Sequence, residues 1–306
     1  MRSTLKFDLN VNANALLCPN PQEFYSKCYI TEDIVDNYRT IPGVKSATKL
    51  ANVLFSNVLT GATCQFQAPT DTLDAVDIDV CSLSAMAELC RFDLEQSFVS
   101  LQMVRGSNGD YTPAAFMSYY WNELSNEVQD EIAQLRWKGN INGGTGTFLD
   151  LCDGYEVKFA NDVNIISGGT GSVTSANVLS AMTQVYSLLP GCLRAKKSDL
   201  RFYVSSNVFQ AYELAAALGN TLTYVTEPLA PSFLGIKVVV CDGMSNDTMV
   251  LTSKNNLIYA FDGEGDSKAL KAVNLEDTVA EPLLRTRVNL KVGFHYVNPT
   301  EIVFYQ

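Results

Sequence analysis

The stretch TPAAFMSYYWNELSNEVQDEIAQLRWK, residues 112–138, decides the fold, because its pattern predicts one helix of unusual length. Thr112 is a residue type that caps helices, and Pro113 suits the first helical position. Apolar residues recur every three or four positions and predict one buried stripe: Phe116, Tyr120, Leu124, Val128, Ile132 and Leu135. The acidic residues lie off that stripe, and Gly139 ends the run. At about 1.5 Å per residue the helix is roughly 40 Å long. It is therefore either a long core helix of an α/β enzyme or the spine of an elongated subunit.

The composition is that of a packed globular protein with few charges. Of the 306 residues, 47% are hydrophobic and 18% are charged, which allows one large domain or two smaller ones. The net charge of −11 argues against nonspecific capture of nucleic acid by a basic surface. A low fraction of charged residues combined with a net charge of −11 indicates that partners cover part of the surface. No apolar run approaches the roughly 18 residues that a membrane helix needs, and the start lacks a signal-peptide core, so we expect no contact with a membrane.

Eight cysteines are scattered along the chain without a C-x-x-C pair or a regular spacing. A chain of this length without a secretion signal usually keeps its cysteines reduced. The sequence therefore predicts reduced, mostly buried thiols.

The first 40 residues predict an extended arm rather than a domain. Asparagines alternate with small or apolar residues around Asn10–Asn14, and Pro19 and Pro21 break any regular element. Apolar residues such as Leu16 and Phe24 favour an arm that becomes ordered against another surface, although a disordered tail stays open.

Residues 41–80 predict a long hairpin. Two β-prone runs, Lys49–Leu59 and Leu73–Val80, flank a bridge that contains Gly61 and Pro69. Such a hairpin either extends away from the body or packs on a core of its own. In the first case its apolar residues gain burial only on assembly: Leu50, Val53, Leu54, Val58 and Leu59.

Two glycine-rich loops, Gly139–Gly146 and Ile166–Gly171, each contain the sequence GGTG. Neither carries the Lys-Ser/Thr of a phosphate-binding P-loop, and neither has the dinucleotide-binding spacing. We therefore interpret both as flexible connectors. Residues 81–111, which precede the long helix, mix helical and extended signals.

The remainder of the chain has an α/β pattern of helices and strands. The sequence predicts helices at Val173–Leu189 and from Ser206 to Gly219, and strands at Leu200–Val204, Ile236–Cys241, Thr248–Thr252, Leu257–Phe261, Leu284–Val292 and Glu301–Tyr305, with Gly293 breaking the last two apart. In Leu284–Val292 apolar residues alternate with Arg285, Arg287 and Lys291, so one face carries three cations. That face is either solvated or meets carboxylates on a neighbouring molecule.

The sequence contains no recognisable catalytic constellation. His295 is the only histidine, so His-rich metal sites and paired-histidine chemistry are excluded. Carboxylate pairs such as Asp77/Asp79 and Glu276/Asp277 occur, but nothing in the sequence brings them to one pocket. We therefore expect no enzyme activity and assign no catalytic, cofactor-binding or metal residue and no cofactor. A hydrolase that uses carboxylates alone stays open.

The order of elements resembles the major capsid proteins of tailed double-stranded-DNA phages, which have the Hong Kong 97 fold shared with encapsulins. The last third carries the resemblance best, in Phe233–Val238 with Cys241–Met244, Thr252–Leu257, Leu284–Gly293 and Asn298–Val303. Leu200–Asn207 also resembles the strand that leads into a helix of the axial domain in that family.

The resemblance implies an α+β capsid fold divided into four parts. They are an N-terminal arm (1–40), an extended loop (41–80), a peripheral domain with the spine helix (81–165 and 276–306) and an axial α/β domain (166–275). It implies a structural protein of the virion that self-assembles as pentamers and hexamers into an icosahedral head around double-stranded DNA, without sequence-specific binding. The implied partners are further copies of the chain, a separate scaffolding protein, a portal and decoration proteins. Assembly would take place in the bacterial cytoplasm. An encapsulin-like compartment would look similar in sequence.

Overall fold

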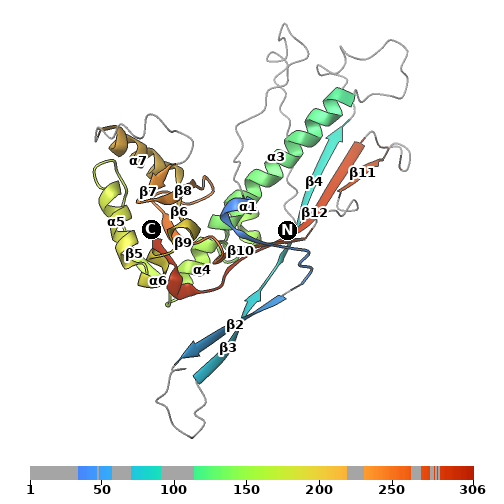
Figure 1. Cartoon of the computed structure of the whole chain (residues 1–306). Coiled ribbons are helices and arrows are strands. Elements are labelled where there is room, and N and C mark those ends of the chain that lie inside the picture. Colours follow the sequence, from blue (N-terminus) through green and yellow to red (C-terminus); the bar gives the residue numbers. More distant parts are fainter. Residues whose placement is uncertain are drawn as a thin grey trace.

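The structure, a computed structural model, describes residues 34–46, 48–56, 70–90, 114–218, 231–262, 270–275, 279, 281 and 283–306. Most of the predicted arm, the bridge of the predicted hairpin (57–69) and the residues from 91 to 111 lie outside these ranges. Figure 1 shows a hairpin at one end of the molecule, a long helix beside a sheet at the other end, and a second α/β unit to one side.

The predicted long helix is confirmed as α3 (Ala114–Lys138). Its C-terminal end is packed tightly, with Leu135 and Trp137 almost fully buried. There the chain crosses the helix end in backbone contact, because a Cβ atom on Gly139 would lie 2.2 Å from the carbonyl oxygen of Cys152. The crossing segment continues from the short helix η2 (Phe148–Leu151) into α4 (Tyr155–Asn161). Only glycine at this position lets the helix and the crossing segment approach so closely.

The first sheet is built around one long strand, β12 (Leu283–Tyr296). The first half of β12 lies between two antiparallel neighbours, β4 (Cys81–Cys90) and β11 (Leu270–Asn274). Its second half pairs with β10 (Leu257–Asp262). The other edge of β10 pairs in parallel with β1 (Arg39–Pro42), which follows the single helical turn α1 (Ile34–Asn37) in the chain. Figure 1 shows β4, β12 and β11 side by side near α3.

Gly293 does not break β12, so the prediction of a break at this residue is wrong. The strand runs through Gly293 without interruption. A Cβ atom there would lie 2.4 Å from the carbonyl oxygen of Asp79. The glycine therefore permits the close crossing of another chain segment rather than ending the strand.

The second sheet has six strands in the order β5 (Ile166–Gly169), β13 (Val303–Tyr305), β9 (Met249–Ser253), β6 (Leu200–Val204), β8 (Ile236–Val240) and β7 (Ser232–Phe233). The helices α5 (Val178–Leu188) and α7 (Ser206–Leu218) pack on one face. The short helices α6 (Gly191–Arg194), η3 (Lys197–Asp199) and η4 (Pro299–Glu301) lie in the connections. The helices and strands predicted for this region are confirmed to within a few residues at their ends.

The second GGTG stretch was predicted as a flexible connector, and this is wrong. Its first two glycines belong to β5, which pairs in parallel with β13. A Cβ atom on Gly168 would lie 3.1 Å from a methyl group of Val185 on α5. The glycines therefore let a helix pack closely on this strand. The first GGTG stretch is an exposed turn, in which Gly144 and Gly146 have positive φ angles.

The two faces of the second sheet belong to two different cores. Phe202 and Val204 of β6 point into the core under α5 and α7. Tyr203 between them points the opposite way, toward Trp137, Tyr155 and Phe159, which we call the aromatic core. Because strand side chains alternate between faces, a single strand joins the two cores.

The predicted hairpin is confirmed as β2 (Thr48–Ser56) and β3 (Thr70–Ile78), which pair antiparallel from Thr48↔Ile78 to Ser56↔Thr70. It projects from the rest of the molecule in Figure 1. Its base is part of the body, however, since Val44 and Ile78 are buried against Ile258 and Ala260, and Leu50 packs on this group. The expectation that Leu50 gains burial only on assembly is therefore wrong.

The pairing of strands crosses the predicted domain limits. β10 and β11 fall in the range given to the axial domain but pair with β12, and β13 falls in the peripheral range but pairs with β5 and β9. The division into four parts stays a proposal.

Candidate interaction surfaces

His295, the one candidate for histidine chemistry, is a packed side chain of β12. Its Nδ1 atom lies 2.8 Å from the backbone nitrogen of Tyr296, and the two rings have centroids 5.0 Å apart. Burial lowers the pKa of His295, and the nearby Lys158 lowers it further, while the carbonyl of Tyr296, Asp79 and Asp77 act in the opposite direction. No nucleophile is hydrogen-bonded to its ring among the described residues.

Two other charged groups near the aromatic core, Glu156 and Lys158, are half-buried and fix α4 in place. Glu156 accepts hydrogen bonds from the backbone N–H and the hydroxyl of Ser245, at 2.7 and 2.6 Å. Burial raises the pKa of Glu156, and these two hydrogen bonds oppose the increase. Lys158 donates to the carbonyl of Phe294, and burial lowers the pKa of its amine. These contacts fix α4 against its neighbours, and within the described part of the chain no three His, Cys, Asp or Glu side chains gather as metal ligands.

The prediction of reduced cysteines is wrong for one pair. Cys81 and Cys152 form a disulfide, with Cα atoms 5.9 Å apart. The bond joins the first residue of β4 to the segment that crosses the end of α3. The two positions are 71 residues apart, so the sequence offered no spacing that would reveal the pair. Cys90, Cys192 and Cys241 are free thiols.

The cationic face of β12 is partly neutralised within the same chain. Arg285 forms an exposed salt bridge with Glu88 of β4, at 2.6 Å. Arg287 is exposed and donates to the hydroxyl of Ser84 and the side-chain oxygen of Asn289. The Lys291 amine donates to the carbonyl of Lys45. The predicted alternation of apolar and charged residues is therefore confirmed, while a neighbour's carboxylate for Arg287 stays a proposal.

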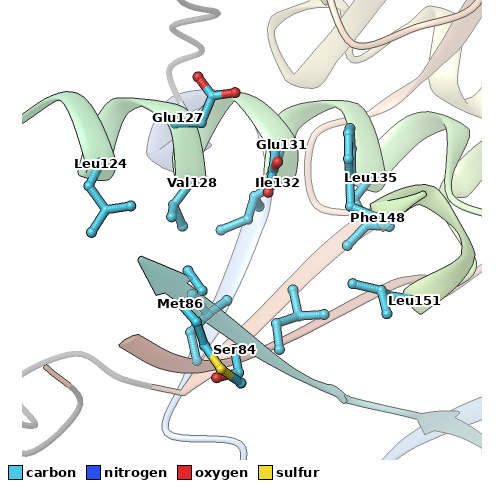
Figure 2. Close-up of a pocket in the computed structure, with 13 residues that line it drawn as sticks. Ser84, Met86, Leu124, Glu127, Val128, Glu131, Ile132, Leu135, Phe148 and Leu151 are labelled. Atoms are coloured by element: carbon cyan, nitrogen blue, oxygen red, sulfur yellow. The ribbon is translucent and has the colours of Figure 1, made fainter. Parts of the chain in front are cut away.

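An apolar groove of about 80 Å³ lies between α3 and β4. Figure 2 shows Leu124, Val128 and Ile132 of α3 pointing toward β4. The exposed Leu151 and its neighbour Phe148 close the groove near the end of the helix. The middle of the predicted helix stripe is only half-buried, because this groove leaves it without full cover.

Sequence reasoning missed the strand β4, which forms the other wall of this groove. Its signal was present, since Leu83, Ala85, Ala87 and Leu89 alternate with more polar residues. The exposed Met86 interrupts the polar row and hides the pattern.

Comparisons with solved structures match the chain to phage capsid proteins along nearly its whole length. The capsid of a native GTA particle has 14% identity and a TM-score of 0.59, and the match covers 99% of each chain. The capsid of Myoviridae phage XM1 has 14% identity and a TM-score of 0.59, covering 96% of this chain and 97% of that one. The capsid of cyanophage P-SCSP1u has 11% identity and a TM-score of 0.54, covering 95% and 93%.

No protein-family model and no curated protein sequence matches the chain. No helix in the described residues has the length and apolarity needed to cross a bilayer. At these identities the structural matches establish the fold alone. The chain has the mixed α+β fold of tailed-phage capsid proteins.

Proposed function

We propose that this chain is the major capsid protein of a tailed phage. Copies assemble as pentamers and hexamers in a Hong Kong 97-type lattice and form an icosahedral head around packaged double-stranded DNA. The net charge of −11 suits a shell that encloses a polyanion without trapping it. A separate scaffolding protein, a portal and decoration proteins complete the head, which assembles in the host cytoplasm.

The observation that carries this proposal is the projecting hairpin. A two-stranded hairpin alone is at best marginally stable in water. Between Lys49 and Asp71 the sequence contains no charged residue, although this stretch includes most of β2 and leads into β3. A projecting ribbon whose first strand carries no charge beyond Lys49 gains stability when an adjacent subunit covers it, and in a closed shell every copy has such a neighbour.

The test replaces the outer part of the hairpin, from Val53 to its register partner Leu73, with a short Gly/Ser linker. This replacement keeps Val44, Leu50 and Ile78, which belong to the buried base. Loop closure depends weakly on loop length, so the melting temperature of the protomer should change little. Each aliphatic side chain that loses its burial costs roughly 1.5–3 kcal/mol, so closed shells should disappear.

Sedimentation and negative-stain electron microscopy of the variant and its parent measure this outcome. A variant that still closes into shells would refute the role of the hairpin, and a variant that cannot fold would place the hairpin in the core. Particles from the native source that hold protein cargo instead of double-stranded DNA would identify an encapsulin-like compartment. A parent that stays a monomer with turnover would identify an enzyme.

A further inference from the structure

The groove between α3 and β4 lies along an open strand edge. Four consecutive residues of β4, Leu83–Met86, line it. Successive side chains of a strand point to opposite faces, so a groove that all four reach is open at the edge of β4 as well as over the face toward α3, where Leu290 of β12 also lines it. On its other side β4 pairs with β12, and it has no second partner among the described residues. The edge therefore offers backbone N–H and C=O groups to a further strand.

The shape and chemistry of the groove fit an amphipathic strand. One wall carries the half-buried stripe of α3, namely Leu124, Val128 and Ile132, and Leu290 of β12 also lines the groove. The outer face of β4 carries the polar Ser82, Ser84 and Glu88 beside the exposed Met86. A strand added at this edge would meet apolar side chains on one face and water on the other.

One segment of this chain has the matching pattern. From Leu5 to Ala15 the residues alternate strictly, with one row apolar and the other polar: Leu5, Phe7, Leu9, Val11, Ala13 and Ala15 against Lys6, Asp8, Asn10, Asn12 and Asn14. A period of two over this length is the pattern of a half-buried strand.

Charge and reach favour this segment over the projecting hairpin of a second copy. β3 would bring three carboxylates, Asp71, Asp74 and Asp77, to a groove that is lined in part by Glu131, whereas Leu5–Ala15 carries one lysine and one aspartate and has no net charge. The described residues begin at Ile34, and the ring centroid of Tyr38, four residues later, lies 6.5 Å from that of Trp137 at the end of α3. The chain from Ala15 to Ile34 spans about 60 Å when extended, far more than the roughly 17 Å from Leu124 to Leu135.

We propose that Leu5–Ala15 pairs with the free edge of β4 in its own copy, placing Leu5, Phe7, Leu9 and Val11 in the groove under α3. The pairing closes an edge that would otherwise join strands of other molecules. It does not depend on the proposed function, because it concerns a single chain.

Hydrogen exchange read by mass spectrometry tests the pairing in the full-length protein. A β4 amide that faces the free edge should exchange roughly tenfold or more slowly in the parent than in a variant without residues 2–15. The double variant Phe7→Asp/Leu9→Asp should lose the same protection. The matched control Asn10→Asp/Asn12→Asp also adds two carboxylates, but on the polar row, and should keep it. Equal exchange of β4 in the parent and the deletion, or equal loss in both double variants, overturns the proposal.

A mixture of chains identifies which copy supplies the strand. Isotopically heavy parent chains are mixed with light chains that lack residues 2–15, under the conditions in which the protein assembles. Protection of β4 confined to the heavy chains supports pairing within one copy. Protection of β4 in the light chains shows that the segment reaches a neighbour and overturns the assignment to its own copy. Both readouts concern β4 peptides, so they are independent of whether shells form.

Discussion

At the scale of single residues, His295 links stability to pH. Burial holds the pKa of this histidine below its ordinary value of 6.5, so between the two values the unfolded chain binds the proton and the folded chain does not. The stability is therefore fully present above pH 6.5 and is lost as the pH falls through the folded-state pKa. We expect the melting temperature of the parent to decrease on acidification below pH 6.5 and to decrease less in His295→Gln.

Glu156 is the matched comparison for His295, because its raised pKa changes the stability with pH in the opposite direction. Burial raises the pKa of this carboxyl, so the folded state gains stability as the pH falls through that value. Glu156→Gln should therefore steepen the loss on acidification, where His295→Gln flattens it. Melting curves of the three proteins across the acid range check both signs, and identical pH profiles would contradict the burial of both groups.

The disulfide between Cys81 and Cys152 gives a second prediction at this scale. It closes a loop with a sequence separation of 71, for which restricting the unfolded chain is worth roughly 2–4 kcal/mol. Cys81→Ser should lower the melting temperature, and a reductant should lower that of the parent toward the same value without affecting the variant. Cys192→Ser, at an exposed free thiol, is the control and should leave the melting temperature unchanged. Equal melting of oxidised and reduced parent would show that the pair stays reduced.

At the scale of elements, α3 is a helix with two different environments. Near its C-terminus it is enclosed by the aromatic core, where the guanidinium of Arg136 lies 5.0 Å from the ring centre of Tyr38 and 5.5 Å from that of Tyr259. Toward its middle the same apolar stripe lines the open groove. The apolar stripe of α3 is therefore uniform in the sequence, but in the structure it is buried near the C-terminus and half-buried in the middle.

This difference predicts unequal effects of one substitution along the stripe. Leu135 is 2% exposed, so Leu135→Asp should cost several kcal/mol of unfolding free energy, on the order of 3–5, because it buries a charge and removes packing. Both variants are made in a protein that lacks residues 2–15, so that the proposed strand cannot cover the groove. There Leu124→Asp, in the half-buried part, should cost about 1–2 kcal/mol, since water reaches its carboxylate. Chemical denaturation of the two soluble variants measures the ranking. An equal loss of unfolding free energy in the two variants would mean that Leu124 is as buried as Leu135, and would contradict the open groove.

The elements show which features a sequence reveals and which it hides. Strands such as Leu200–Val204 were predictable because their apolar runs end at turn residues. The strands β4 and β5 were missed because Met86 interrupts one alternation and glycines disguise the other. Gly293 suggested a break because its role depends on Asp79, which is far away in the sequence. The groove arises only when α3 and β4 meet, so no local pattern could indicate it.

At the scale of the whole molecule, the sheet that contains β12 exposes a cation without a carboxylate beside it. Arg285 has its partner in Glu88, whereas Arg287 has only neutral partners among the described residues. If carboxylates of a neighbour complete this face, Arg287→Glu should weaken assembly at low salt, and the difference should shrink as salt screens the charges. The folding stability should change by less than about 0.5 kcal/mol, because the side chain is exposed.

Light scattering of assembly at two salt concentrations checks this prediction. Lys196→Glu makes the same change of charge at an exposed position of the second α/β unit and serves as the control. Arg287→Glu that assembles as the parent does at low salt would indicate that this face is merely solvated.

The base of the hairpin has a mechanical consequence for the molecule. Ile78 is anchored in the body, the carbonyl of Asp79 lies against Gly293, and Cys81 is bonded to Cys152. Because these three contacts follow one another closely along the chain, the hairpin cannot rotate as a rigid body where it joins β4. If neighbouring subunits shift relative to one another, the hairpin must bend along its own length, because its base is fixed to the body. The outer residues of β2 and β3 can then follow a neighbour while a restoring force returns them to one orientation.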